Sequence, residues 1–371
     1  MQEDFHYYAT YCAAFLAGYS HEESMEICYS AQFVDCCTRT LLRKIGGPDE
    51  AATTQLQMEL MQARTDRPGL QDITRIWSSF HFLPRDLTAD PPRRTSKEYR
   101  NKYRLICGPN GDLIVDTVEL AKGSSLQAAG IAMHVMADTW AHAYFAGTPS
   151  LVINNTGYYF YEILTSGGKK VEKRLAFRHS ASEPDEPEES RYTSSIFQTS
   201  ENTVMNLGHG RAGHLPDYSF VTYRYLPAWG DYAVIVKDNP SDYMKAFTQM
   251  VYALRYLRGD IPVFEKETYD TETVAPYKET IDAILRKRQL DACKDWKAFG
   301  ESLSGCGIDD FDLDRYQDEY VKADDRNGTF IGRFTRASIA HKSMVASRIY
   351  SSGNKLAGIS VFRTEEGGEM K

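Results

Sequence analysis

Three side chains that can bind a metal recur every four residues in one stretch of the sequence. His134, Asp138 and His142 lie in the segment AAGIAMHVMADTWAHAYFAG. Residues four apart share one face of an α-helix, so these side chains would project together. Imidazole nitrogens and carboxylate oxygens are ligands that zinc accepts at sites that keep a position open for water. The spacing therefore predicts a metal-binding helix.

The same stretch also has a purely structural interpretation. A histidine among alanine, methionine, valine and tryptophan is often a hydrogen-bonded core residue. A carboxylate buried between two histidines is harder to explain, because an unpaired charge away from water is costly. A shared cation is the simpler explanation for Asp138.

A second cluster of candidate ligands lies in the glycine-rich phrase GHGRAGHLPDYSF at 208–220. It contains His209, His214 and Asp217, and glycines allow the backbone to approach a ligand closely. Arg211 is a candidate partner for a phosphate oxygen. The structural alternatives are a turn in which Asp217 caps the next strand, a surface histidine and a surface arginine. The choice between His209 and His214 as the ligand stays open.

Four further candidates precede the central stretch. Asp4 and His6 fall in the opening EDFHYY, and Asp35 falls in the apolar phrase AQFVDCC, where a carboxylate needs a partner. His81 lies between two phenylalanines and, taken alone, is more simply a core histidine. Six of the nine histidines are among the candidates, so shared chemistry explains the clustering better than chance. The others are expected to be surface or structural residues: His21, His179 and His341.

Helices must position these residues in the first 150 residues of the chain. The central helix is expected to begin after Ser124 or Ser125 and to end at Gly147, with Pro149 beyond it. A capping box at Ser20 and Glu23 predicts the start of another helix. The earlier helices are expected at 4–18, 20–43 and 50–64.

The residue pattern changes after position 150. Short strands are expected at LVINN, YYFYEIL, FVTYRYL and DYAVIVKD within 150–238. Helical patterns then resume at 241–258, 270–290, 293–304 and 311–350. The whole predicts one mostly α-helical domain over 1–371, with three parts: a helical metal-binding core 1–150, a β-rich and loop insertion 151–238, and C-terminal helices 239–360.

Composition excludes some classes of function. A net charge of −8 and a pI near 5.7 offer no general attraction for polyanions, so no stable nucleic-acid complex is expected. No run of about eighteen apolar residues occurs, so no integral membrane association is expected. The acidic opening MQED does not resemble a secretory signal. Seven cysteines without a C-x-x-C do not indicate a disulfide framework or a cysteine zinc site. These features predict a cytoplasmic protein and leave its oligomeric state open.

Taken in chain order, the candidates resemble the ligand pattern of the zinc-dependent phospholipase C and single-strand-specific nuclease superfamily. The pattern consists of His6, Asp35, His81, His134-x-x-x-Asp138, His142 and a late histidine with an aspartate. The phrases DFHYYATYCAAFLAGYS, AQFVD and GHGRAGHLPDYSF look like a distant bacterial branch of it. The resemblance covers about the first 220 residues. It implies a multi-helix phospholipase C/nuclease-like core with a three-metal site between the helices.

Carried onto this sequence, the resemblance implies three metal positions. The first ion would be held by Asp35, His81, His134 and Asp138. The second would be held by His142, Asp217 and one of His209 or His214. The third would be bridged by Asp138 and bound by His6.

The sequence departs from that pattern at the third ion. The family uses the amino group and carbonyl of a processed N-terminal tryptophan there, whereas this chain begins MQED. Asp4 is expected to take this role, because its carboxylate lies two residues before His6. The spacing between Asp138 and His142 is also shorter than in the family.

The expected function is hydrolysis of a phosphodiester, phospholipase C-like or nuclease-like, with two or three zinc ions that manganese or iron can replace. Paired ions lower the pKa of a bridging water, polarise the phosphoryl oxygen and stabilise the leaving oxygen. Asp138 would bridge the ions, and Asp35 would act as the acid. The expected substrate is a small-molecule or lipid phosphodiester.

A rival expectation is a non-catalytic protein that metal stabilises and that uses its tyrosine-rich middle to bind a partner. A closed, fully protein-ligated site would favour it, because catalytic zinc needs an exchangeable position. A further class, the helical phosphohydrolases built on an adjacent His-Asp pair, is disfavoured because the sequence has no such dipeptide.

Overall fold

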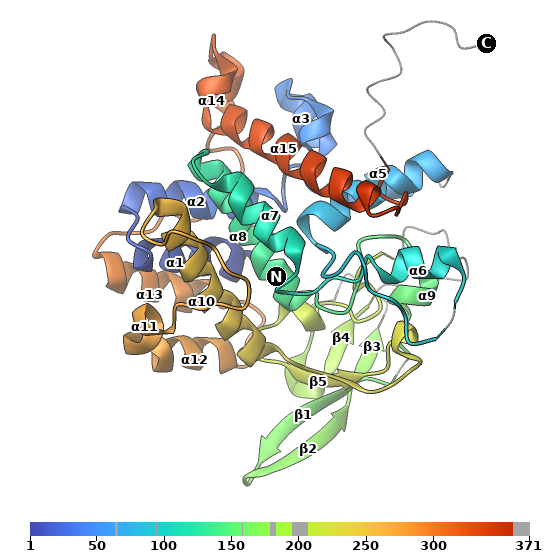
Figure 1. Ribbon diagram of the computed structural model, residues 1–371. Helices are drawn as coiled ribbons and strands as arrows, with labels where there is room; N and C mark the ends of the chain where they lie inside the picture. The colour runs from blue at the N-terminus through green and yellow to red at the C-terminus, as the bar shows by residue number, and fades with distance from the viewer. Residues whose placement is uncertain (64–65, 94, 158, 179–182, 195–206, 359–371) are drawn as a thin grey trace, which may run out of the picture.

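The computed structural model describes residues 1–63, 66–93, 95–157, 159–178, 183–194 and 207–358. Helices dominate, and the short strands of the two sheets fall between Tyr161 and Asp238 (Figure 1). The mostly α-helical class predicted from the sequence is confirmed. No helix within these described ranges combines the length and the apolar character needed to cross a membrane. One histidine of the sequence, His179, lies outside the described residues.

The helices of the first half surround the metal-ligand candidates. A π-helix opens the chain: η1 (Asp4–Ala9). The α-helices that follow are α1 (Thr10–Leu16), α2 (His21–Phe33), α3 (Arg39–Ile45), α4 (Gln57–Met61), α5 (Arg67–Phe80), α6 (Lys97–Tyr103), α7 (Asp112–Ala121), α8 (Leu126–Ala141) and α9 (Leu151–Asn154).

The strands and the second half of the chain complete the fold. The strands are β1 (Tyr161–Ser166), β2 (Lys169–Arg174), β3 (Ala176–Arg178), β4 (Arg191–Thr193), β5 (Thr222–Tyr225) and β6 (Ile235–Asp238). The later α-helices are α10 (Asn239–Arg258), α11 (Thr271–Val274), α12 (Lys278–Arg286), α13 (Cys293–Ser304), α14 (Gln317–Lys322) and α15 (Phe330–Ser351). Short 3-10 helices are η2 (Asp49–Ala51), η3 (Pro187–Glu189), η5 (Leu215–Asp217), η6 (Ala228–Gly230), η7 (Ala275–Tyr277) and η8 (Arg326–Gly328).

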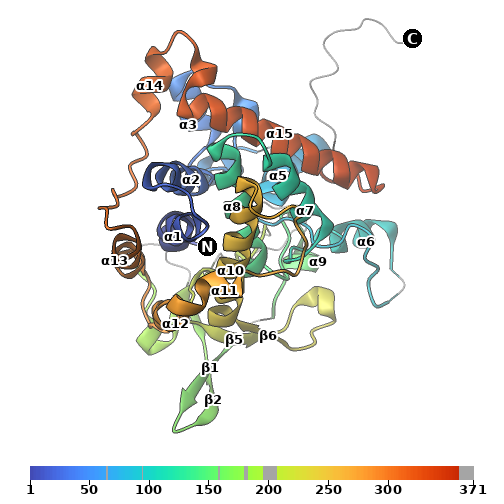
Figure 2. The same cartoon turned by 60° about the vertical axis from the view of Figure 1, so that its left-hand side comes forward.

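Helix α8 is the centre of the helical core. Its sequence is apolar on nearly every side, and each residue from Gln127 to Ala141 is buried. It packs against α2, α7, α10 and α15, and both views place it among the other helices (Figures 1 and 2). Gly130 permits the close approach of α2, because an added Cβ would lie 2.4 Å from the carbonyl oxygen of Ile27. The predicted ligand-bearing helix is therefore held rigidly from several directions.

The strands form a small antiparallel sheet with the order β2-β1-β5-β6 and a separate parallel pair, β3 and β4. Tyr161 lies opposite Arg174 in the β1–β2 hairpin, and this hairpin projects away from the helices in both views (Figure 2). Tyr223 and Tyr225 on β5 are fully buried. They belong to a second apolar core, which also contains Phe82 beside the candidate ligands.

Two expected helices have different ends in the structure. The stretch 20–43 is not one helix, because α2 ends at Phe33 and Thr38 caps a new helix by accepting a hydrogen bond from Leu41 N–H. The central helix ends at Ala141, before the expected Gly147.

The expected helix at 4–18 is confirmed: its first turns form the π-helix η1, and it continues as α1 to Leu16. Two other expectations for local structure are wrong. Within the described part of 50–64, only the short helices η2 and α4 form. The phrase LVINN forms helix α9 instead of a strand.

Candidate metal centre

Donor atoms from five segments of the chain meet beside α8. Three groups have ligand atoms that all lie within 4.8 Å of one another: His6, His134 and Asp138; Asp35, His81 and His134; and His142, His209 and Asp217. They come from η1, the turn after α2, the end of α5, helix α8, and the segment 207–217. The structure thus brings most of the predicted ligands into one cluster that could hold metal ions.

Asp138 lies at the middle of this cluster and is 1% exposed. Its Oδ1 atom is 3.2 Å from His6 Nε2 and 2.8 Å from the amino nitrogen of Met1. Its Oδ2 atom is 3.3 Å from both His81 Nδ1 and His134 Nε2. Because its two oxygens face different histidines, this carboxylate can contact two ions at once.

Backbone carbonyls fix the tautomers of the histidines around Asp138. The carbonyl of Ala31 accepts from His134 Nδ1–H at 2.9 Å, and that of Thr53 accepts from His81 Nε2–H at 3.1 Å. Each ring therefore turns a lone pair towards the cluster. These two lone-pair nitrogens, His134 Nε2 and His81 Nδ1, are only 3.3 Å apart.

The histidines of the third group are oriented in the same way. His142 Nδ1–H donates to the carbonyl of His81 at 2.7 Å, and His209 Nδ1–H donates to that of Gly213 at 2.7 Å. Their Nε2 atoms face Asp217, at 3.0 Å from Oδ1 for His142 and 3.5 Å from Oδ2 for His209. Metal-binding histidines usually donate their second N–H to an oxygen in this manner.

His6 adds a buried imidazole whose two ring nitrogens lack hydrogen-bond partners among the described residues. It is fully buried, and neither nitrogen has a hydrogen bond of acceptable geometry within the described part of the chain. Its ring stacks on His134 with the centroids 3.8 Å apart. Burial, together with the nearby His134, lowers the pKa of His6 to about 4. The ring is therefore neutral at pH 7 and has a lone pair available for a cation.

The charges of the centre are strongly coupled. Burial alone would raise the pKa of Asp138, but His142, the Met1 amino group and other histidines lower it well below its usual range. Asp217 has a low pKa for similar reasons, with His209 the largest favourable neighbour. Burial also lowers the pKa of His209 to about 4. Neutral imidazoles and ionised carboxylates are the forms that bind metal.

The amino group of Met1 lies inside the cluster. Besides Asp138 Oδ1, it is 3.2 Å from Asp217 Oδ1 and 3.4 Å from His142 Nε2. Burial lowers its pKa, but the surrounding carboxylates outweigh that effect and raise the value to about 11. This nitrogen links the two carboxylates that serve separate groups of histidines.

The expected role of Asp4 beside His6 is not met. Asp4 Oδ2 accepts a hydrogen bond from Ala292 N–H at 3.3 Å, at the start of α13, and Asp4 is absent from the three ligand groups found among the described residues. The π-helical turn directs its side chain towards α13 while His6 faces α8. The position beside His6 and Asp138 is taken by the Met1 amino nitrogen.

The structure also distinguishes the two histidines of the glycine-rich segment. His209 belongs to a ligand group, whereas His214 is exposed at the N-terminal end of η5. Arg211 is partly exposed and is not among the described residues that line the cavity at the centre. The prediction of a phosphate-binding role for Arg211 therefore gains no support from its position.

A cavity of about 170 Å³ adjoins the ligands. Asp35 lines it and is 31% exposed, which makes it more open than Asp138 and Asp217. The cavity gives at least one side of the cluster access to water or a small ligand, since one water occupies about 30 Å³ of liquid.

The sequence analysis missed four residues that line this cavity: Met1, Thr54, Trp77 and Phe82. The position of Trp77 four residues before His81 on α5 was a usable signal, because such residues share a helix face. Their rings are 5.0 Å apart. The signal for Met1 was the resemblance itself, because the family uses an N-terminal amino group at the third position, and the sequence analysis assigned that role to Asp4 instead.

The donor set fits a metal ion better than it fits hydrogen bonding alone. Lone pairs of His81 and His134 and a carboxylate oxygen of Asp138 face one another at 3.3 Å, with no hydrogen to share in the ionised, neutral-imidazole state. Only a cation or added protons can make that arrangement favourable. Mixed nitrogen and oxygen ligands suit zinc, manganese and iron.

Comparison with known proteins places the chain in a family without assigning an activity. No curated protein and no solved structure matches it. One family model matches residues 1–349, and the chain belongs to that family, a family of unknown function (DUF6765).

Proposed function

We propose that this protein is a metal-dependent hydrolase that cleaves a phosphodiester at the centre beside α8. The observation that carries the proposal is the set of four histidines whose tautomers are fixed by backbone carbonyls and whose lone pairs converge on two ionised carboxylates. That set is His81, His134, His142 and His209. We expect two or three ions, with zinc preferred and manganese or iron as substitutes.

The carboxylates and histidines of the centre would have separate roles in holding the ions. Asp138 joins two ligand groups through its separate oxygens, and Asp217 serves the third. The carbonyl contacts hold each imidazole in one orientation, which keeps the donor atoms in place before any ion arrives. Bound ions would supply an ionised water at neutral pH and stabilise negative charge on the phosphoryl and leaving oxygens.

Asp35 is the residue best placed to move a proton. It lines the cavity and is partly exposed, and its oxygens are 3.7 Å from His81 Nδ1 and 4.0 Å from His6 Nε2. These separations are longer than those of Asp138, so Asp35 is held less tightly by the histidines. A carboxylate at the open side of the centre can orient a water or protonate a leaving oxygen.

The cavity limits what part of a substrate enters. Its volume of about 170 Å³ suits a phosphate group, with the organic parts remaining at or outside its mouth. Trp77 and Phe82 give one wall an aromatic surface. We therefore propose a small-molecule or lipid phosphodiester as substrate, in keeping with the resemblance to zinc-dependent phospholipase C and single-strand-specific nucleases.

The test combines metal analysis with a generic substrate. Protein purified without chelator should contain two or three transition-metal ions per chain by plasma mass spectrometry. It should also hydrolyse bis(p-nitrophenyl) phosphate, and His209→Ala should abolish this activity. The exposed neighbour in the same segment provides the matched control, since His214→Ala should keep both metal and activity.

The possible results separate the proposal from its rival. Fewer than one ion per chain after reconstitution with zinc, manganese and iron would end the metal proposal. Full metal content without hydrolysis of nitrophenyl, lipid, nucleotide or single-stranded substrates would favour a metal-stabilised binding protein. Equal activity in both histidine variants would point to a contaminating enzyme.

A further inference from the structure

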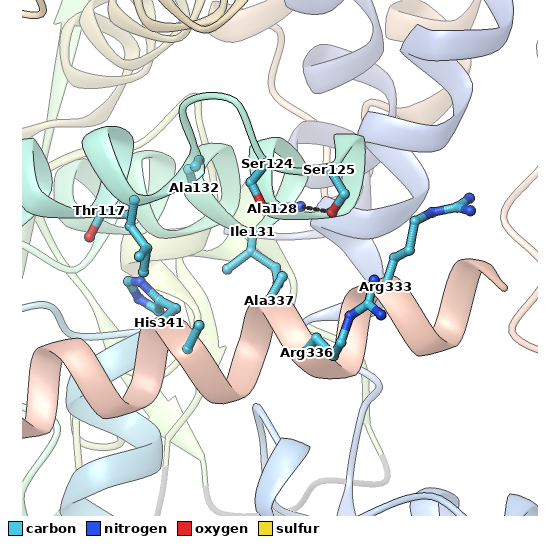
Figure 3. A pocket seen from close by; sticks show the side chains of 13 residues that line it. Thr117, Ser124, Ser125, Ala128, Ile131, Ala132, Arg333, Arg336, Ala337 and His341 are labelled. Carbon is cyan, nitrogen blue, oxygen red and sulfur yellow. Dashed lines mark hydrogen bonds between the residues drawn. The ribbon is translucent and has the colours of Figure 1, made fainter. Parts of the chain in front are cut away.

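A second cavity, of about 460 Å³, lies between α7, α8 and α15 (Figure 3). Its described lining shares no residue with the cavity at the metal centre. Most of the lining is apolar and comes from Leu120, Ala121, Ala128, Ile131, Ala132, Ala337 and Ala340. Its volume falls within the usual range for small-molecule sites, roughly 300–1,000 Å³.

One end of this cavity is positively charged. Arg333 and Arg336 project from α15 towards the start of α8, where Ser124 and Ser125 also lie (Figure 3). Arg333 is held by Gln127 Oε1 at 3.0 Å and by Glu26 Oε2 at 3.4 Å. Arg336 is exposed, and no ion-pair or hydrogen-bond partner for it is found among the residues that the structure describes. Its charge is therefore free to meet an anion.

The helix beside these arginines reinforces the positive potential. Ser125 caps α8 by accepting a hydrogen bond from Ala128 N–H at 3.3 Å. The first backbone N–H groups of a helix point out of its N-terminal end and favour negative charge there. Helix α8 has sixteen residues, which is long enough for its dipole to contribute.

A histidine, His341, lines the opposite end of the cavity. His341 is 3% exposed, and its Nε2–H donates to the carbonyl of Ser79 at 2.8 Å. The other ring nitrogen, Nδ1, therefore carries a lone pair, and within the described ranges that atom has no partner. Burial lowers the pKa of His341 to about 4, so the ring is neutral at pH 7. His341 lines the cavity, so a ligand hydroxyl there could donate a hydrogen bond to this nitrogen.

We propose that this cavity binds a small organic anion with an apolar body. The anionic group would meet Arg336 and the start of α8, and the apolar body would cover Ile131. A hydroxyl at the far end of the ligand would donate to His341 Nδ1. The site is separate from the proposed phosphodiesterase centre and does not depend on metal.

Isothermal titration calorimetry with octyl sulfate tests the anionic end, because an alkyl sulfate is a poor ligand for transition metals. The chelator-treated protein should bind one octyl sulfate per chain at least about tenfold more tightly than octanol, since a hydrogen bond to a charged group is stronger than a neutral one. Arg336→Gln should remove that preference. The matched control is Arg286→Gln on α12, an exposed arginine paired with Asp282, and it should leave binding unchanged.

A second variant tests the location independently of charge. Ala340→Trp places a large ring at an exposed position on the cavity wall and should abolish binding of both compounds while the thermal unfolding midpoint is retained. Addition of a terminal hydroxyl, as in 8-hydroxyoctyl sulfate, should tighten binding through His341. Unchanged affinity in both Arg336→Gln and Ala340→Trp, or binding without a defined stoichiometry, would overturn the proposal. Equal affinity for octyl sulfate and 8-hydroxyoctyl sulfate would show that His341 does not contact the ligand.

Discussion

The Nδ1–H group of His142 donates a hydrogen bond to the carbonyl oxygen of His81, at 2.7 Å. This bond joins the end of α8 to the end of α5 and connects two of the ligand groups. His142 thus has two tasks: it offers Nε2 to the group that contains Asp217, and it fixes the backbone that carries His81.

His142→Ala should therefore lose more bound metal ions per chain than His209→Ala. The first variant removes one ligand and releases the backbone of His81, so we expect loss of more than one ion per chain. The second variant removes only a ligand of the Asp217 group, so we expect loss of about one ion at most. Plasma mass spectrometry of both proteins, purified side by side, gives the comparison. Equal losses would show that the bond between His142 and His81 does not stabilise the second ligand group.

Asp138→Ala should also remove more than one ion, because the two oxygens of Asp138 serve histidines of different groups. Asp217→Ala should leave the ion beside His81 and His134. An exposed carboxylate offers the control, and Asp282→Ala on α12 should bind as much metal as the unaltered protein. If Asp138→Ala retains a full complement of ions, the central position assigned to this residue is wrong.

One residue added before Met1 should disturb the centre. It would convert the buried amino group into an amide, which can neither carry the positive charge nor contact Asp138 and Asp217 in the same way. Removal of one partner from a buried charge pair costs about 3–5 kcal/mol. We expect a lower unfolding free energy of the metal-free protein, with the N-terminal residue verified by intact mass. The same residue appended after Lys371 is the control, and equal effects of the two additions would argue against a role for the Met1 nitrogen.

Gly130→Ala should loosen the contact between α2 and α8. The new Cβ would lie 2.4 Å from Ile27 O and 2.5 Å from Ser30 Cβ, so the helices must separate. Such overpacking costs about 1–3 kcal/mol. The hydrogen bond from His134 to Ala31 spans the same two helices, so metal affinity should fall together with the unfolding midpoint. Gly307→Ala is the matched control, because a Cβ there meets nothing within 4 Å, and a similar loss in both variants would contradict the packing argument.

His341 should make the protein less stable in mild acid. Its pKa is about 4 in the folded state, against about 6.5 for an exposed histidine, because burial disfavours the charged ring. Between these values the unfolded chain binds the proton more readily, so stability falls as pH falls. The contribution lost between pH 7 and pH 5 is about 2 kcal/mol. We would measure the unfolding free energy by denaturant at both pH values for chelator-treated unaltered protein and for His341→Gln. The drop between pH 7 and pH 5 should be smaller in the variant by this amount. An identical drop in the two proteins would refute the low pKa of His341.

Local sequence patterns predicted the ligand helix well, for a clear physical reason. The spacing of His134 and Asp138 and the capping serine at Ser125 are local features, and the helix that they predict forms from Leu126 to Ala141. The strands β5 and β6 likewise follow from aromatic and β-branched residues close in sequence. In both cases, the information lies within a few residues of the element that it specifies.

The turn that positions Asp35 could not be predicted in the same way. The carbonyl of Val34 accepts a hydrogen bond from Thr53 Oγ1 at 2.6 Å, and that of Cys37 accepts from Thr53 N–H at 2.9 Å. Bonds from a distant segment satisfy the backbone where α2 ends, and no glycine or proline marks the break. The cap residue Thr38 was the one local signal available.

The choice of His209 over His214, and the failure of Asp4, depend on three-dimensional packing. Both histidines follow a glycine, but Gly213 O accepts the hydrogen bond that orients His209. Asp4 was expected beside His6 from a separation of two residues. The π-helical geometry and the N–H of Ala292 direct it elsewhere.

The packing of η1 on α13 has a consequence for the order in which the protein is assembled during synthesis. His6 is carried by η1, and Phe5 of the same turn rests edge-on against Trp296, with the ring centroids 6.0 Å apart. Helix η1 also packs on α1, α2 and α8, so α13, which is made later, completes the support of this early residue. All the candidate ligands precede α13 in the sequence, so the contact that completes the support of His6 can form only after α13 is made. Metal uptake would then be a late step of biogenesis. A chain stalled after the sheet would carry all these side chains, but α13 would not yet hold η1 in place.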